Sequence, residues 1–228
     1  MSNVTPPLDN TLTATAGRFS ANQRPVNANL GRSPLAHLTP PAVAVHVSNS
    51  VGVHFSERGL LGHLTLRCAP ENTQQQTTVA QLLGTELPLD PLTSVQQDGL
   101  SVCWLAPDEW LITLPAEQAF ALESAFHERM LGHWALVNVS SGLTVYRLTG
   151  PHAVDVLKKS VPVDLHASAF PVGKVVTTVF AKASATLLRV DDECWDVVVR
   201  RSFADYVWLW IQDASREFGF ALESDEQR

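Results

Sequence analysis

The sequence has little cysteine and no long apolar run. Its three cysteines, Cys68, Cys103 and Cys194, are far apart and form no CxxC pair, which argues against a disulfide framework or a zinc site. No stretch approaches the roughly 18 apolar residues that a membrane span requires. The first ten residues carry neither the basic nor the apolar segment of a signal peptide. We therefore expect reduced thiols, a cytoplasmic location and no membrane partner.

Clustered positive charge and nucleotide-binding motifs are also missing. The net charge is -7, and the sequence contains no run of basic residues, so nucleic acid is not expected as a partner. No GxGxxG occurs, so nothing supports dinucleotide binding. Gly173-Lys174 is followed by Val175 rather than Ser or Thr, which excludes a phosphate-binding P-loop at that point.

Motifs for metal-dependent or nucleophilic catalysis are incomplete. His127-Glu128 begins like a zinc-protease helix, but Leu131 stands where the second histidine is needed. The eight histidines never occur four residues apart, so no ligand spacing supports a metal site. Ser140-Ser141-Gly142 lacks the preceding glycine of a nucleophile elbow. We expect no catalytic residue, no bound cofactor and no metal ligand in this chain.

The chain is long and apolar enough to form a globular core. It has 228 residues, of which 45% are hydrophobic. Residues 1–33 are rich in Thr, Asn, Pro and Ala, a composition that predicts a flexible tail, with docking onto a partner chain as the alternative. Residues 34–222 are expected to form a single two-lobed domain, and residues 223–228 a solvated end.

Apolar alternation and helical periodicity predict an α+β fold with mainly antiparallel sheets and packed helices. Four helices are expected, over Thr77–Leu83, over Glu117–Leu131, after Gly150-Pro151 and after Ser202. Gly150 would cap the third helix and Ser202 the fourth. The predicted strands are Val43–Val47, Val51–Phe55, Leu64–Arg67, Leu100–Leu105, Trp110–Leu114, Leu143–Leu148, Val175–Phe180, Ser184–Val190 and Cys194–Arg200.

The last predicted helix supplies the first candidate for a partner contact. Its buried stripe is expected to contain Phe203, Val207, Trp210, Ala214 and Phe218. Trp208 lies off that stripe, and tryptophan is enriched at protein interfaces, so Trp208 is the leading candidate. Trp110 and Asp108 are further candidates, although core packing is the simpler interpretation of a tryptophan in a strand.

Several motifs occur in an order that resembles one known family. They are VNVSSG (137–142), RLTGP (147–151), VDLH (163–166), FPVG (170–173), WLAPDEWL (104–111) and RSFA (201–204). This order resembles the gamma subunit of heterotetrameric sarcosine oxidase, a family similar in turn to the folate-binding aminomethyltransferase of the glycine cleavage system. The chain departs from the family pattern at Ser160-Val161, where Gly-Cys is expected, and at Asn138, where Asp is usual.

The resemblance implies a noncatalytic gamma subunit that works with alpha, beta and delta subunits. That complex would demethylate sarcosine to glycine, and its FAD, FMN, NAD and tetrahydrofolate would be held by the other subunits. Residues 165–190 contain no Asp or Glu, so the segment offers no carboxylate to assist a folate amine. Asp191, Asp192 and Glu193 follow in a predicted tight turn, where solvation is the expected role.

Three alternatives remain open from the sequence. A sister complex that acts on another N-methyl amino acid would have a similar gamma chain. A free-standing folate-binding or aminomethyl-transferring protein of this fold would need a carboxylate-lined pocket near its centre. An iron-sulfur assembly factor would need a reactive cysteine in the central stretch, and no cysteine lies between Cys103 and Cys194.

Overall fold

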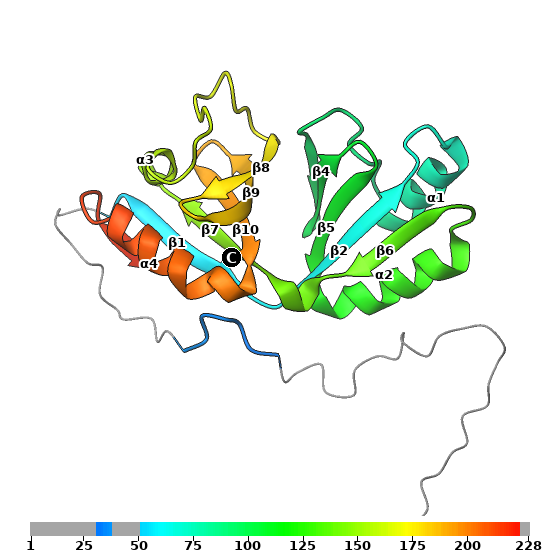
Figure 1. The fold of residues 1–228 in the computed structure, drawn as a ribbon, viewed down its shortest axis with the longest axis horizontal. Helices are drawn as coiled ribbons and strands as arrows, with labels where there is room; N and C mark the ends of the chain where they lie inside the picture. Colours follow the sequence, from blue (N-terminus) through cyan, green and yellow to red (C-terminus); the bar gives the residue numbers. More distant parts are fainter. Residues whose placement is uncertain (1–30, 38–50, 224–228) are drawn as a thin grey trace, which may run out of the picture.

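Two β-sheets, each with its own helices, lie side by side in this protein (Figure 1). The structure is a computed structural model that describes residues 31–37 and 51–223. The predicted strand Val43–Val47, residues 1–30 of the predicted tail and residues 224–228 of the predicted C-terminal end lie outside the described part. The boundaries proposed for the tail and for the single domain therefore stay predictions.

The six-stranded lobe has the strand order β11-β1-β7-β10-β9-β8. Helices α3 (Ala153–Lys158) and α4 (Ala204–Ala214) cover one face of this sheet. The strands are β1 (Val53–Arg58), β7 (Leu143–Thr149), β8 (Val175–Phe180), β9 (Ala183–Asp191), β10 (Cys194–Arg200) and β11 (Phe220–Leu222).

The five-stranded lobe has the order β3-β4-β5-β2-β6. Helices α1 (Thr73–Leu83) and α2 (Ala116–Arg129) pack on one of its faces. The strands are β2 (Leu61–Cys68), β3 (Ser94–Gln97), β4 (Leu100–Ala106), β5 (Glu109–Pro115) and β6 (Trp134–Asn138).

Between residues 51 and 223 the chain crosses between the lobes twice. It forms β1 in the six-stranded lobe, builds the whole five-stranded lobe from β2 to β6, and returns at β7 through the short 3-10 helix η3 (Ser140–Gly142). Among the strands of the described residues, all pairs are antiparallel except β1 with β11. The predicted α+β class with mainly antiparallel sheets is confirmed.

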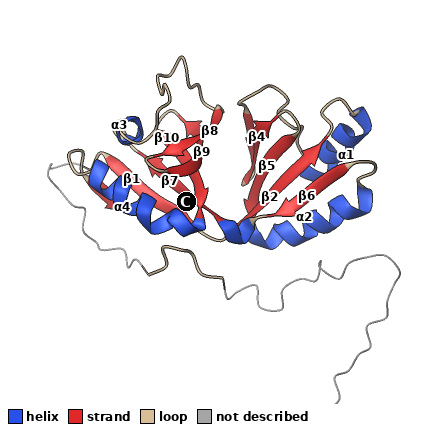
Figure 2. Cartoon of the chain, viewed as in Figure 1, coloured by secondary structure: helices blue, strands red, loops and turns tan. Residues whose placement is uncertain are grey.

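The inner faces of the two sheets pack on each other, and the helices lie on the outer sides (Figure 2). Strand β7 shows how the sequence produces this arrangement. Tyr146 and Leu148 point to the helices of their own lobe, whereas Val145, just before Tyr146, packs with Leu111 of the other sheet. Because successive side chains of a strand alternate between faces, one strand serves two cores. The prediction that this strand is covered on both sides is confirmed.

Hydrogen bonds between loops tie the lobes together a third time. The backbone N–H of Val175 donates to the carbonyl of Leu92 (2.9 Å), and the Ser94 hydroxyl donates to the carbonyl of Gly173 (2.7 Å). The segment around Gly173 thus belongs to the junction between the lobes.

Helix α4 has a different buried face from the one predicted. It begins at Ala204, after a 3-10 turn η4 (Arg201–Phe203), and has no side-chain cap, so Ser202 is not its N-cap. The predicted stripe is wrong for Phe203 and Trp210, which are exposed. The stripe that faces the sheet comprises Ala204, Val207, Trp208 and Ile211. Residues 206–211 are apolar almost all round the helix, so the sequence pattern alone is compatible with two different buried faces.

Helix α3 also starts later than predicted. Its first residue is Ala153, and Gly150 lies before it with a φ of 105° rather than at the N-cap. The predicted apolar face of Ala153, Val156 and Leu157 is buried as expected. In α1, the predicted stop at Gly84 is confirmed, since this glycine is the left-handed C-cap with a φ of 73°.

The turn before α3 lies against the backbone of Gly52, which has no space for a side chain. A Cβ at Gly52 would lie 2.6 Å from the carbonyl oxygen of Phe218 and 2.7 Å from Cδ2 of His152. We expect Gly52→Ala to lower the free energy of unfolding by about 1–3 kcal/mol, because the backbone must shift. Gly142→Ala is the matched control, since a Cβ there meets nothing within 4 Å. Urea unfolding that shows equal stability for the two variants would contradict this prediction.

Candidate functional site

A charged cluster lies on the inner face of the six-stranded sheet, where a central catalytic site would be expected. The strand register places Asp196 of β10 opposite Arg147 of β7. Asp196 accepts hydrogen bonds from Nε (2.7 Å) and Nη2 (2.8 Å) of Arg147, and Arg58 of β1 approaches it at 3.4 Å. The Asp196 side chain is only 6% exposed. Because guanidinium groups hold both of its oxygens, this carboxylate is not available as a general base.

His63 of β2 lies on the opposite inner face and is also buried. Its Nδ1 lies 3.2 Å from the hydroxyl of Thr113. Burial, together with the positive charge of Arg58, lowers the pKa of His63 from 6.5 to about 4. The imidazole is therefore neutral at neutral pH, and its ring is closed to solvent.

Apolar side chains from both sheets fill the space beside these charges. Leu111 and Cys103 come from the five-stranded sheet, and Val145, Leu188 and Val198 come from the six-stranded sheet. Burial raises the pKa of the Cys103 thiol to about 11, so this cysteine is protonated and unreactive. Around these residues the two inner faces meet in a packed apolar cluster, and Asp196 beside it is held in ion pairs.

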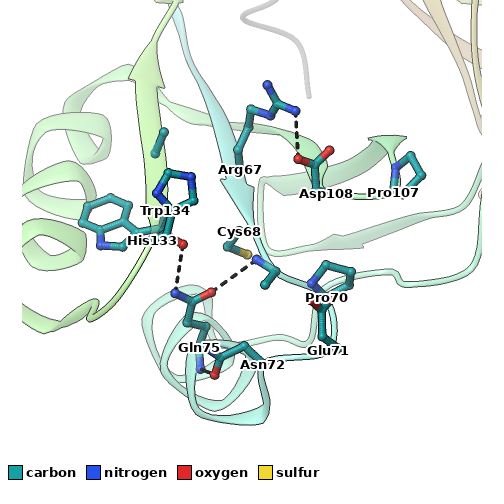
Figure 3. Close-up of a pocket in the computed structure, with 12 residues that line it drawn as sticks. Arg67, Cys68, Pro70, Glu71, Asn72, Gln75, Pro107, Asp108, His133 and Trp134 are labelled. Atoms are coloured by element: carbon teal, nitrogen blue, oxygen red, sulfur yellow. Dashed lines mark hydrogen bonds and ion pairs between the residues drawn. The ribbon is translucent and has the colours of Figure 1, made fainter.

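A cavity with a volume of 680 Å³ lies at the outer end of the five-stranded lobe. The loop between β2 and α1, the turn between β4 and β5, and the start of β6 surround it. Figure 3 shows Arg67 directed toward Asp108 on one side, with His133 and Trp134 on another. An ion pair of 2.8 Å joins Arg67 to Asp108.

A buried glutamine holds the loops around this cavity in place. The side-chain oxygen of Gln75 accepts from the N–H of Ala69 (3.3 Å), and its nitrogen donates to the carbonyls of Leu131 (2.8 Å) and His133 (3.1 Å). Asn72 caps the first turn of α1 by accepting from the N–H of Gln75. These bonds join the start of α1 to the segment before β6, so the cavity wall is a defined structure.

The cavity offers contacts for binding but no activated nucleophile. Burial and the nearby Asp108 raise the pKa of Cys68 to about 11, which keeps this thiol protonated at neutral pH. The charge of Arg67 is matched by Asp108 and, at 3.8 Å, by Glu109. An aromatic ring and paired charges at an open rim are features of a protein contact surface rather than of a reaction centre.

Within residues 31–37 and 51–223, no cluster of three or more His, Cys, Asp or Glu side chains is arranged to hold a metal ion. No helix in this part of the chain is long and apolar enough to cross a membrane.

The structure separates the three residues that the sequence suggests as partner contacts. Trp208 is 7% exposed, and its ring packs against Phe55 and Phe220 with centroid distances of 4.9 Å and 5.5 Å. Trp110 is also in the core, where its Nε1 donates to the carbonyl of Pro88 (2.7 Å). Neither side chain is presented at the surface of the chain. Asp108 is exposed at the rim of the cavity, and its role in an interface stays a prediction.

Sequence reasoning missed the cluster of Arg58, Arg147 and Asp196. Arg58 is 138 positions from Asp196, and Arg147 is 49 positions from Asp196. Only the strand registers bring the three residues together. The one signal in the sequence was the presence of single charges inside otherwise apolar strands, as in the run from Cys194 to Arg200. A charge buried in such a strand requires a partner on a neighbouring strand.

A solved structure shares this two-lobed fold. Aminomethyltransferase T of the glycine cleavage system from Bartonella henselae superposes with a TM-score of 0.54 at 13% identity, over 76% of this chain and 48% of that chain. The chain is therefore a two-lobed α+β protein with a fold similar to that of the aminomethyltransferase, and its central carboxylate is ion-paired.

Sequence comparison narrows this class to one family. The sarcosine oxidase gamma subunit family matches residues 69–217. The gamma subunit from Corynebacterium sp. (strain U-96) is 34% identical over 199 residues, which are 86% of this chain and 95% of the relative. That from Arthrobacter sp. is 32% identical over 196 residues, or 84% and 93%. The chain belongs to the sarcosine oxidase gamma subunit family.

A solved structure supports the same assignment. A chain of heterotetrameric sarcosine oxidase from Corynebacterium sp. U-96, in complex with pyrrole 2-carboxylate, superposes with a TM-score of 0.74 at 31% identity. The match covers 83% of this chain and 96% of that chain. The resemblance inferred from the sequence motifs is confirmed.

The buried ion pairs predict a large effect of removing the central carboxylate. We expect Asp196→Asn to lower the free energy of unfolding by about 3–5 kcal/mol, because it removes the buried carboxylate that pairs with the half-buried guanidinium groups of Arg147 and Arg58. Asp108→Asn, which breaks an exposed ion pair, should cost less than about 1 kcal/mol. Chemical unfolding of both variants at neutral pH measures the difference. A loss for Asp196→Asn as small as that for Asp108→Asn would show that the cluster is not a buried charge network.

The lowered pKa of His63 predicts a loss of stability in acid. The unfolded chain binds a proton at a pKa near 6.5, whereas the folded chain resists protonation until about 4. Stability should therefore fall as the pH drops from about 6.5 to about 4, by on the order of 2–3 kcal/mol. His63→Gln, which stays neutral, should lack this part of the pH dependence. Urea unfolding at neutral pH and near pH 4 tests this, and an identical decline in both proteins would refute it.

Proposed function

We propose that this chain is the noncatalytic gamma subunit of a heterotetrameric sarcosine oxidase and supports the oxidative demethylation of sarcosine to glycine. The observation that carries the proposal is the match to a chain of a solved heterotetrameric sarcosine oxidase, which extends over 96% of that chain at 31% identity. A match over nearly the whole relative favours the same role in the complex rather than a shared fold alone.

The geometry of the centre supports a role without chemistry. Asp196 is held by two guanidinium groups, His63 is closed to solvent, and Cys103 is protonated. A folate-dependent aminomethyl transfer needs a free carboxylate beside the bound folate. The central carboxylate described here is already used to join β1, β7 and β10.

The proposal also assigns cofactors and partners. FAD, FMN, NAD and tetrahydrofolate would be bound by the other subunits, and the alpha, beta and delta subunits would be the partners. The complex would act in the cytoplasm, in sarcosine catabolism and one-carbon metabolism. This chain would contribute a contact surface and structural rigidity to the complex.

Asp108 is the residue that we propose as a contact with another subunit. Its carboxylate lies at the mouth of the 680 Å³ cavity, beside Arg67, and is 48% exposed. A rim charge of this kind influences partner choice and association rate more than fold stability. The cavity next to it, at 680 Å³, has room for a side chain from a partner.

Co-expression with the three other subunits tests the proposed function. A tag on this chain should recover a flavin-coloured complex in which the chain is equimolar to the larger subunits after size-exclusion chromatography. Asp108→Lys should reduce the amount of complex recovered, because it reverses a charge at the rim. Glu128→Lys, an exposed position on α2, is the matched control and should have little effect.

Two results would count against the proposal. A colourless monomer that binds tetrahydrofolate by itself would favour a free-standing folate protein. Recovery of an active complex from which this chain is absent would show that the subunit is not part of the oxidase. Equal recovery with Asp108→Lys would remove Asp108 from the interface and leave the subunit assignment intact.

A further inference from the structure

Helix α4 carries apolar side chains on the face that it turns away from its sheet. Leu209 is 59% exposed, and Trp210, whose Nε1 donates to the hydroxyl of Ser160 (3.0 Å), is 37% exposed. Phe203, in the 3-10 turn just before the helix, is 42% exposed, and the ring of Tyr206 lies 6.4 Å from that of Trp210. The opposite face is already buried through Val207, Trp208 and Ile211. A helix that is apolar on both sides is normally covered on both sides.

The chain is anchored beside the first turn of α4 before it leaves the described part. Nε2 of His37 lies 3.2 Å from Oδ1 of Asp205. Arg201, just before the helix, donates to the carbonyl of Arg32. Leu35, between these contacts, is buried in the core of the six-stranded lobe. Residues 31–37 therefore lead toward the start of α4.

The chain returns to the described part at the other end of α4. The N–H of Gly52 donates to the carbonyls of Phe218 (2.9 Å) and Gly219 (3.2 Å), which follow the last turn of the helix. Residues 38–50 must therefore connect the beginning of α4 to its end. The helix has 11 residues and is about 16 Å long, whereas residues 38–50 can span about 40 Å when extended.

The composition of this connection matches an apolar surface. Residues 38–50 contain no Asp, Glu, Lys or Arg, and Val43, Val45 and Val47 alternate with smaller or polar residues. Such alternation places three valines on one side of an extended chain. We propose that residues 38–50 dock along the outer face of α4 and cover Leu209 and Trp210. This proposal does not depend on the proposed function.

Protection of a single cysteine tests the docking in the isolated full-length chain. Leu209→Cys adds a thiol to the outer face of α4, and Leu131→Cys is the matched control in the other lobe, at a position that is 65% exposed. The native cysteines are buried. Maleimide labelling is followed at each position by peptide mass spectrometry and normalised to the rate of the same variant in urea. We expect labelling at position 209 to be roughly tenfold slower than at 131, since it requires a local opening.

A second variant identifies the covering segment. Val43→Ser, Val45→Ser and Val47→Ser together, in the Leu209→Cys chain, should restore labelling at position 209 and leave position 131 unchanged in the control chain. Equal labelling at 209 and 131 in the isolated chain would overturn the proposal, and that comparison does not require the serine variant to fold.

The test also separates this docking from subunit assembly. Protection at position 209 that appears only after the other subunits are added would identify a partner chain as the occupant of this face. That result would overturn the docking of residues 38–50 while supporting the proposed function. Protection of position 209 in the isolated chain, combined with failure to assemble with the other subunits, would support the docking of residues 38–50 and count against the proposed function.

Discussion

The packing of the two sheets on each other through their inner faces is the constraint on which the rest of the structure depends. Each sheet must bury both of its sides, because helices cover the outer faces and the other sheet covers the inner one. Charged groups on the inner faces then have to be neutralised inside the protein. The bidentate bond between Arg147 and Asp196, with Arg58 beside it, meets this requirement and links three strands of one sheet.

Much of the strand framework could be predicted because alternation and local turns determine it. The predicted bounds Val175–Phe180 and Cys194–Arg200 are those observed for β8 and β10. The stop of α1 at Gly84 follows from the freedom of glycine in the left-handed region. The α+β class with mainly antiparallel sheets follows from consecutive strands that pair as hairpins, such as β9 with β10. Such features depend on neighbours within a few residues, which are visible in a sequence.

Features that depend on distant neighbours could not be predicted. Strand β6 (Trp134–Asn138) is short and mostly exposed, and β2 determines its place as an edge partner. Strand β11 (Phe220–Leu222) has three residues and forms by parallel pairing with β1. The phase of α4 is set by the 3-10 turn before it and by the pocket around Phe55 that receives Trp208. The central charge cluster likewise depends on the registers of three strands, and so its geometry was not visible in the sequence.

The buried position of Trp208 changes where recognition can occur in this fold. A tryptophan that packs between Phe55 and Phe220 stabilises the six-stranded lobe and holds α4 on its sheet. Because this packing uses one face of α4, the exposed apolar side chains of Leu209 and Trp210 lie outside that face. The centre of the molecule is occupied by packed valines, leucines and ion pairs. The apolar side chains that remain accessible in the described part of the chain therefore lie outside these packed regions, on the outer surfaces of the lobes.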